Sequence, residues 1–262
     1  MLPQTPFYYY DIALLQATLD AIRHEIAQHP NYHVHYALKA NANPRLLEVI
    51  QQAGLGADCV SGGEVQRAIE AGFPADKVVY AGVGKSDREI LLALQHDIFC
   101  FNVESIPELQ VINELAEREG KVARVCLRIN PDVEAHTHTH IVTGMAENKF
   151  GIALEHMMTV VEMVNEVPHV PFEGLHFHIG SQITNMQDYV ALCQRVNEIQ
   201  YQLNKHGIYP SVINVGGGLG IDYQSPENHP IANFKAYFQV FTQHLHLRAE
   251  QSLHFELGRS VV

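Results

Sequence analysis

The feature that most constrains the fold is a regular alternation of strand-like and helix-like segments along nearly the whole chain. Short apolar runs with strand character recur at 33–38, 56–60, 78–81, 99–103, 123–129, 174–179, 212–215 and 253–257. Segments with apolar residues near a 3.6-residue period separate them, at 44–53, 63–71, 86–95, 106–118, 154–167, 187–206 and 234–245. Strict alternation of this kind predicts a parallel sheet, and eight units predict an α/β fold of the (β/α)8 TIM barrel type.

The same alternation also allows an open, doubly wound sheet, which is the alternative fold. A length of 262 residues fits a single barrel, because α/β barrels commonly reach this size as one domain. The chain ends five residues after the eighth strand-like run. We therefore expect a barrel over 11–262 that lacks its final helix.

Charge and composition argue against several classes of partner. The net charge of -12 leaves no excess of basic side chains to neutralise nucleic-acid phosphates or an anionic membrane surface. The sequence has neither a long apolar run nor a signal-peptide pattern, which predicts a cytoplasmic protein. The cysteines at 59, 100, 126 and 193 are far apart, so neither a disulfide framework nor a zinc site is expected.

Side chains able to do chemistry cluster at the C-terminal ends of the strand-like runs and just after them, where α/β barrels place their functional groups. In chain order they are Lys39, Asp58, Ser61, Glu64, Asn102, Glu104, Arg128, Asn130, His176, His178, Ser181, Gly216, Gly217, Gly218, Glu256 and Arg259. One barrel mouth would thus bring together an amine, imidazoles, carboxylates, guanidinium groups and a glycine-rich turn.

Lys39 closes the first strand-like run and precedes the turn sequence Asn41-Ala-Asn-Pro44. Burial at such a place would disfavour the ammonium form and free the amine as a nucleophile toward a carbonyl group. An ordinary surface lysine at a strand end is the alternative.

The run Gly216-Gly-Gly-Leu-Gly220 follows the seventh strand. Backbone N–H groups of such a turn can cradle a phosphate, although a tight turn alone would also need glycine. An amine and a phosphate cradle together favour pyridoxal phosphate as the cofactor. Glu256 would keep its pyridine nitrogen protonated, or else form an ion pair with Arg259. His178 would stack on the ring, or else be a core histidine.

Nine ordered motifs give the chain a specific resemblance to a known family. They are Thr5-Pro-Phe-Tyr-Tyr-Tyr-Asp11, Tyr36-Ala-Leu-Lys-Ala-Asn41, Gly56-Ala-Asp-Cys-Val-Ser-Gly-Gly-Glu64, Phe101-Asn-Val-Glu-Ser105, Arg128-Ile-Asn-Pro-Asp132, Lys149-Phe-Gly151, His176-Phe-His-Ile-Gly-Ser-Gln182, Asn214-Val-Gly-Gly-Gly218 and Glu256-Leu-Gly-Arg259. The set resembles the diaminopimelate decarboxylases, the lysine-biosynthetic branch of the alanine-racemase-like, fold-type III pyridoxal phosphate enzymes.

The resemblance implies a role for each matching residue. Lys39 would bind the cofactor covalently, and His178 would stack on its ring as the second catalytic residue. The remaining cofactor-binding residues would be Asp58, Glu64, Arg128, Ser181, Gly216, Gly217, Gly218, Glu256, Gly258 and Arg259, with Arg259 also binding substrate. The implied reaction is decarboxylation of meso-2,6-diaminopimelate to L-lysine and CO2, in a protein that is a homodimer at full length.

Two departures from the family pattern stand out. Leu257 replaces the family's proline, which carries no reactive group. The chain also ends at Val262, before the C-terminal β-domain of the family, with which residues 1–10 would pair as an N-terminal strand. That domain would supply the acid that delivers the proton. We therefore expect the 262-residue chain alone to bind cofactor weakly and turn over poorly.

The segment from His136-Thr-His-Thr-His140 to Lys149-Phe-Gly151 resembles the loop that separates diaminopimelate decarboxylases from ornithine and arginine relatives. The alternating His136, His138 and His140 suggest a metal site, but no nearby cysteine or carboxylate completes a ligand set, so no metal is expected. Three alternatives stay open: a related decarboxylase or racemase, a non-catalytic pyridoxal phosphate carrier barrel, and a pseudoenzyme.

Overall fold

A computed structural model describes residues 4–133 and 150–262 and contains a closed parallel barrel of eight strands. In order around the barrel these are β1 (Tyr32–Ala37), β2 (Gly56–Cys59), β3 (Val78–Tyr80), β4 (Cys100–Val103), β5 (Val125–Arg128), β6 (Phe172–His176), β7 (Val212–Asn214) and β8 (Ser252–Leu257). The barrel closes because β1 pairs in parallel with β8, from Tyr32↔Leu253 to Tyr36↔Leu257. The predicted (β/α)8 barrel is confirmed, and the open sheet is excluded.

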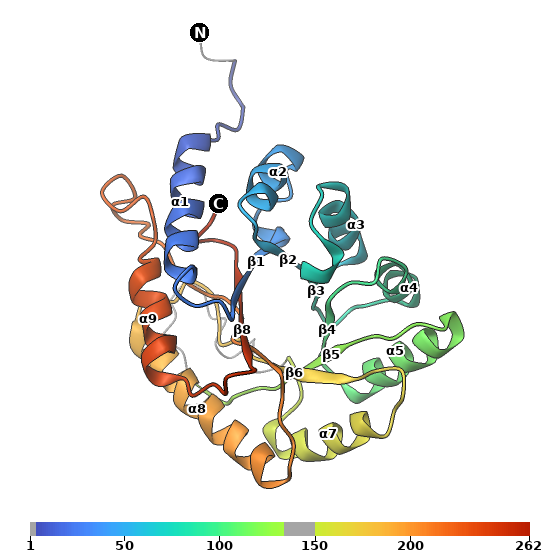
Figure 1. Ribbon diagram of the computed structural model, residues 1–262. Coiled ribbons are helices and arrows are strands. Elements are labelled where there is room, and N and C mark those ends of the chain that lie inside the picture. The colour runs from blue at the N-terminus through green and yellow to red at the C-terminus, as the bar shows by residue number, and fades with distance from the viewer. Residues whose placement is uncertain (1–3, 134–149) are drawn as a thin grey trace.

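Helices surround the barrel on all sides (Figure 1). In the described residues they are α1 (Ile12–Ile26), α2 (Pro44–Gln52), α3 (Gly62–Glu70), α4 (Asp87–Gln95), α5 (Ile106–Glu119), α7 (Met157–Asn165), α8 (Met186–Lys205) and α9 (Phe234–His244), with 3-10 turns η1 (Leu38–Ala40), η2 (Ala75–Lys77) and η3 (Leu154–His156). Each of the seven helical segments predicted between strands is present.

The prediction omits α1, because it considers only the segments between strands. The Asp11 side chain caps this helix by accepting the Leu14 N–H. Leu15, Leu19 and Ile22 are buried at helical spacing. The helix contacts α9 and lies between α9 and α2 in the ring (Figure 1). It thus fills the place that a helix after β8 would take.

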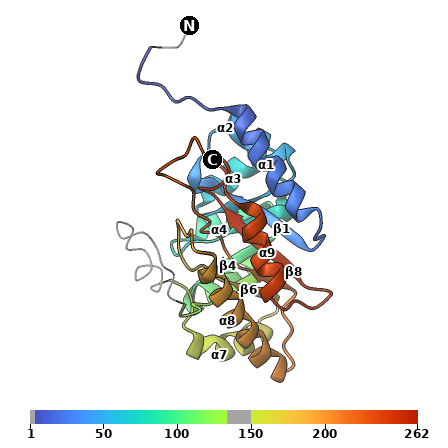
Figure 2. The ribbon, with the colours of Figure 1, turned by 90° about the vertical axis from the view of Figure 1, so that its left-hand side faces the viewer.

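Residues 4–10, for which a strand is predicted, form neither a strand nor a helix. They run away from the ring of helices, as Figures 1 and 2 show. A strand needs a neighbour to pair its backbone groups, and these residues have none among the described residues. The predicted pairing with a further domain is not tested and stays a prediction.

Side chains of β8 alternate between the helices and the barrel interior. Phe255 packs edge-on against the rings of Tyr237, Phe238 and Phe241 around α9, so it points outward. Because successive strand residues point to opposite faces, His254 and Glu256 point into the barrel. The barrel interior is therefore partly polar.

A chain of hydrogen bonds joins two buried histidines near the N-terminal ends of β1 and β8. His35 Nδ1 lies 3.1 Å from the Lys77 carbonyl oxygen, which can only accept, so Nδ1 carries the proton. His35 Nε2 therefore accepts from His254 Nδ1 at 2.8 Å, and His254 Nε2 accepts from Ser252 Oγ at 2.9 Å. Both rings are neutral in this arrangement, and burial lowers the pKa of His35 from its ordinary 6.5 to about 4.

Acidification is therefore expected to destabilise the fold through His35. The unfolded chain binds a proton at this histidine near pH 6.5 and the folded chain only near pH 4, so the free energy of unfolding falls as pH drops between these values. From pH 7 to pH 5 the loss attributable to His35 is roughly 2 kcal/mol. Urea unfolding of the wild type and of His35→Gln at both pH values measures it.

The difference in pH dependence between the wild type and His35→Gln measures what His35 contributes to the free energy of unfolding. Burial raises the pKa of Asp58, which contributes to pH dependence with the opposite sign. That contribution is common to both proteins and cancels in the difference. Equal pH slopes for wild type and His35→Gln would contradict the assignment.

Within the described ranges, no helix has both the length and the apolar character that crossing a membrane requires. All four cysteines are buried and free.

Candidate functional site

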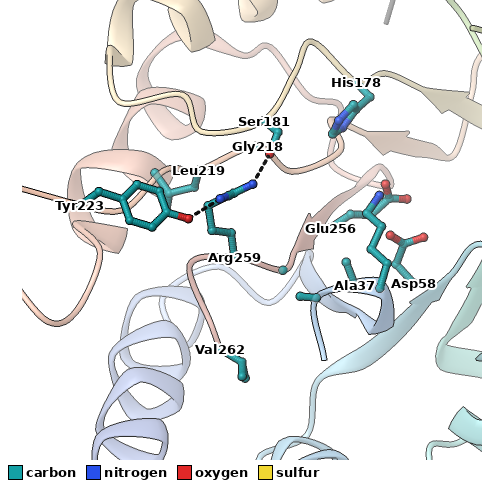
Figure 3. A pocket seen from close by; sticks show the side chains of 13 residues that line it. Ala37, Asp58, His178, Ser181, Gly218, Leu219, Tyr223, Glu256, Arg259 and Val262 are labelled. Atoms are coloured by element: carbon teal, nitrogen blue, oxygen red, sulfur yellow. Dashed lines mark hydrogen bonds between the residues drawn. The ribbon is translucent and has the colours of Figure 1, made fainter. Parts of the chain in front are cut away.

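A cavity of about 520 Å³ opens at the C-terminal ends of the barrel strands. It is lined by Ala37, Lys39, Ala40, Asp58, His178, Ser181, Gly218, Leu219, Tyr223, Glu256, Gly258, Arg259 and Val262. Eight predicted site residues are among them: Lys39, Asp58, His178, Ser181, Gly218, Glu256, Gly258 and Arg259. In Figure 3, His178, Glu256 and Asp58 lie toward one end of the cavity, and Tyr223 and Arg259 toward the other.

Lys39 lies on η1, the single 3-10 turn that follows β1. The prediction that it is buried at a strand end is wrong, because the side chain leaves the barrel interior at this turn and is exposed. Hydrogen bonds hold the turn: Tyr36 donates to the Asn41 carbonyl oxygen, and the Asn41 side chain accepts the Asn43 N–H. The amine is therefore accessible from the cavity and close enough to Asp58 to affect that carboxyl group.

Asp58 is a buried carboxyl group in the cavity wall, and its Oδ1 has no hydrogen-bond partner among the described residues. Burial and the nearby charge of Glu256 raise the pKa of Asp58, while Lys39 and Arg128 oppose the rise. The net direction is upward, so Asp58 stays protonated to a higher pH than an exposed aspartic acid does. A protonated Asp58 can donate a hydrogen bond into the cavity.

Glu256 is the opposite case, a buried carboxylate surrounded by donors. Its Oε1 accepts from Asn102 Nδ2 at 3.0 Å and Asn214 Nδ2 at 2.8 Å, and its Oε2 lies 3.0 Å from His176 Nε2. Burial alone would raise the pKa of Glu256, but the interactions with His176, Lys39 and His178 outweigh it and lower the pKa well below its usual range. The predicted alternative, an ion pair with Arg259, is not observed.

Arg259 reaches two partners on other loops. Its guanidinium donates from Nη1 to the Tyr223 hydroxyl and from Nη2 to Ser181 Oγ, the latter at 3.4 Å. Its Nε is buried without a hydrogen-bond partner among the described residues. The residues at this end of the cavity thus offer a cation and a hydroxyl, which suit an anionic group.

His178 follows β6 and is half-buried in the cavity wall, so it is not an enclosed core histidine. It lies close against the glycine turn, because a Cβ on Gly216 would come within 2.9 Å of His178 Nδ1. Its imidazole is therefore held against the wall by the backbone of the turn.

The glycine turn after β7 has no room for side chains. Gly216 and Gly218 have positive φ values of 68° and 93°, which favour glycine. A Cβ on Gly217 would lie 1.8 Å from the Glu256 carbonyl oxygen. Of the three glycines, only Gly218 lines the cavity. Gly216 and Gly217 pack against neighbouring backbone behind it.

Replacing Gly217 with alanine is expected to destabilise the protein by at least about 2 kcal/mol, because the added methyl group would overlap buried backbone. The matched control is Gly63→Ala in the first turn of α3, where the nearest atom to the added Cβ lies 3.8 Å away. That change should be neutral or stabilise by about 0.5–1 kcal/mol. Thermal unfolding followed by circular dichroism compares them, and similar melting temperatures for the two variants would contradict this packing.

Glu64 and Arg128 do not line the cavity but lie behind it. Glu64 Oε2 accepts the Val60 N–H at 2.7 Å, which fixes the loop after β2. Arg128 Nη1 pairs with Glu104 Oε2 at 3.0 Å, and Glu104 Oε1 accepts the Gly82 N–H. These two predicted cofactor-binding residues therefore contact neighbouring chain segments in this structure.

The residues that hold Glu256 were the least predictable part of the site. Asn102 and His176 belong to the predicted strand-end set but without a role, and Asn214 is named only as the first residue of the Asn214–Gly218 motif. Their common signal is position, since each points into the barrel from β4, β6 or β7. Tyr223 also lies outside the predicted set.

The predicted loop segment lies almost wholly outside the described residues. This includes His136, His138, His140 and Lys149, so its prediction is not tested. In residues 4–133 and 150–262, no group of three histidine, cysteine or acidic side chains is arranged to hold a metal ion.

Comparison with known proteins gives consistent matches. Residues 13–262 match the family model described as pyridoxal-dependent decarboxylase, pyridoxal binding domain. The chain is 60% identical, over 99% of its length, to a diaminopimelate decarboxylase of Bacteroides thetaiotaomicron, of which it covers 67%. It is 39% identical over 86% of its length to a diaminopimelate decarboxylase of Aquifex aeolicus, covering 53% of that protein.

Solved structures agree with these matches. The crystal structure of diaminopimelate decarboxylase from Helicobacter pylori complexed with L-lysine aligns with a TM-score of 0.90 at 36% identity, covering 99% of this chain and 65% of that one. The resemblance drawn from the nine motifs is confirmed. The chain spans between about half and two thirds of the length of these relatives.

Proposed function

This chain belongs to the pyridoxal-dependent decarboxylases, and on that premise we propose that it is the cofactor-binding barrel of a diaminopimelate decarboxylase. The proposed reaction releases CO2 from meso-2,6-diaminopimelate and yields L-lysine. The observation that carries the proposal is 60% identity to the Bacteroides diaminopimelate decarboxylase over 99% of this chain.

The cavity residues fit pyridoxal phosphate. The accessible amine of Lys39 could react with the aldehyde of the cofactor, and the carboxylate of Glu256 could accept a hydrogen bond from its pyridine nitrogen. Toward the other end, the turn at Gly218 leaves its backbone uncovered, and Arg259 has an unpartnered buried Nε. Together with Ser181 these groups suit a phosphate or a substrate carboxylate.

Each residue then has a definite task. Pyridoxal phosphate, when bound, supplies an electron sink for the negative charge left by loss of CO2. Lys39 Nζ provides the nucleophile that attaches the cofactor. Glu256 would accept a hydrogen bond from the ring nitrogen, and Asp58, whose pKa is raised by burial, would lie close to the attached lysine. His178 packs against the glycine turn, where it can cover one face of a planar ring.

The assignment is tested by supplying the purified full-length protein and pyridoxal phosphate with meso-diaminopimelate, ornithine or arginine, and measuring CO2 and the amine product. We expect L-lysine from diaminopimelate and at least about a hundredfold lower kcat/KM with the other two substrates. Faster turnover of ornithine or arginine would instead support a related decarboxylase of this fold.

Assembly and location are proposed from the same resemblance. We propose a homodimer at full length in the cytoplasm, acting on a small amino acid. Light scattering on the full-length protein tests the dimer, which a monomeric mass at micromolar concentration would contradict.

A further inference from the structure

Three side chains from three different strands enclose the Glu256 carboxylate. Asn102 belongs to β4, His176 to β6 and Asn214 to β7, and each places a nitrogen 2.8–3.0 Å from a carboxylate oxygen. These three residues are at most 1% exposed, and Glu256 is 8% exposed. A carboxylate so far from water depends on its neighbours for its ionisation state.

The orientation of each neighbour indicates that it donates. Asn214 Oδ1 accepts the Gly216 N–H at 2.9 Å, so its Nδ2 must face Glu256. Asn102 places its Nδ2 toward the same oxygen. Burial lowers the pKa of His176, and its Nδ1 has no hydrogen-bond partner among the described residues, which places the ring proton on Nε2. Glu256 therefore accepts three hydrogen bonds from neutral donors.

Such an arrangement favours the ionised carboxylate. A protonated carboxyl group would have to direct its hydrogen at a donor or into the cavity, whereas the anion accepts all three bonds. Carboxylates that accept two or three N–H bonds are strongly stabilised as anions. Lys39 and His178 act in the same direction. Burial shifts the pKa of the neighbouring acid, Asp58, upward, which is the opposite direction to the pKa of Glu256.

One acceptor position remains available. Oε1 accepts two hydrogen bonds and Oε2 only one, and Glu256 lines the cavity. A carboxylate has about four lone-pair positions, so Oε2 keeps one for a ligand in the cavity.

We propose that Asn102, Asn214 and His176 are positioning residues that fix Glu256 as an anion, so that a proton shared with the pyridine nitrogen of a bound cofactor would rest on the nitrogen. This inference rests on the proposed function, because it assigns the ring of pyridoxal phosphate to the cavity. The three residues act through Glu256 and do not line the cavity themselves. By keeping the ring cationic, they set its capacity to accept electrons.

The first test uses the protein without cofactor. Protein carrying ¹³C-labelled glutamate side chains is titrated by NMR, and the Glu256 signal is identified by its loss in Glu256→Gln. We expect Glu256 to stay ionised over the whole pH range in which the protein remains folded. Asn102→Asp replaces a donor with an acidic group of the same size and should raise the pKa of Glu256 enough to bring its titration into the pH range in which the protein is folded.

Two further variants serve as controls for this test. Asn228→Asp makes the same chemical change at an exposed position and should leave the Glu256 titration unchanged. Asn102→Leu removes one donor without adding charge, and should raise the pKa by less than Asn102→Asp does. If Asn102→Asp does not fold, Asn102→Leu takes its place in the titration. A Glu256 carboxyl group that titrates near neutral pH in the wild type, or titrations unaffected by both Asn102 changes, would overturn the proposal.

The second test reports on the cofactor without substrate. Pyridoxal phosphate labelled with ¹⁵N in the ring is bound to wild type, Asn102→Asp and Asn228→Asp, and the nitrogen shift distinguishes protonated from neutral ring. We expect a protonated ring in the wild type and Asn228→Asp, and a shift toward the neutral ring in Asn102→Asp. A neutral ring in the wild type would contradict the inference.

These outcomes separate the inference from the proposed function. Turnover of a substrate other than diaminopimelate would overturn the proposed function and leave both NMR results standing. Failure of the folded protein to bind pyridoxal phosphate would overturn both.

Discussion

Replacing Lys39 with alanine is expected to abolish covalent attachment of pyridoxal phosphate and to lower decarboxylation at least about a thousandfold. The reason is chemical, because no other described residue in the cavity lining carries a primary amine. Since Lys39 is an exposed residue on a short turn, the substitution should leave the melting temperature within a few degrees of the wild type. In the full-length protein, the visible absorbance of bound cofactor and the rate of CO2 release measure the two losses.

Two controls separate amine chemistry from charge. Lys39→Arg keeps a positive charge in the same place but offers no amine that can be freed as a nucleophile, and it should behave like Lys39→Ala. Lys77→Ala removes an exposed lysine at the opposite end of the barrel and should behave like wild type. A Lys39→Ala protein that still shows bound-cofactor absorbance and near-wild-type turnover would contradict the assignment.

Replacing Glu256 with glutamine is expected to cause the second large loss of activity. The variant should still attach cofactor through Lys39, but decarboxylation should fall on the order of a hundredfold, because a neutral amide no longer favours a protonated ring. The loss should appear in kcat more than in KM. One of the three donors around the side chain would also lose its acceptor, at a cost of about 1–3 kcal/mol in stability.

The control is Glu250→Gln, which removes an exposed carboxylate just before β8. It should leave kcat, KM and melting temperature close to wild type. Glu256→Gln turnover within threefold of wild type would show that ring protonation does not depend on this carboxylate.

Much of the fold could be predicted because it follows from local patterns. Strands and helices alternate strictly, and the predicted residues that meet at the barrel mouth lie at the C-terminal ends of strands or in the loops that follow them. The helix α1 was not predictable from that alternation, because it precedes the first strand. Its place in the ring depends on its contact with α9, which is far away in sequence.

The exposure and the hydrogen bonds of individual side chains were harder to predict than their position. Lys39 reaches the cavity as expected, but a single 3-10 turn carries it out of the barrel interior and exposes it. The hydrogen bonds around Glu256 depend on which inward positions of β4, β6 and β7 lie at the same height in the barrel. That relation comes from strand register, which short sequence motifs do not report.

The central claim is that Lys39 attaches pyridoxal phosphate in this cavity. The most direct measurement is to bind the cofactor, reduce the protein with borohydride and locate the added pyridoxyl group by peptide mass spectrometry. We predict a single modified peptide containing Lys39, and none in Lys39→Ala. A pyridoxyl group on another lysine, or an unmodified Lys39 in protein that has bound the cofactor, would contradict the account.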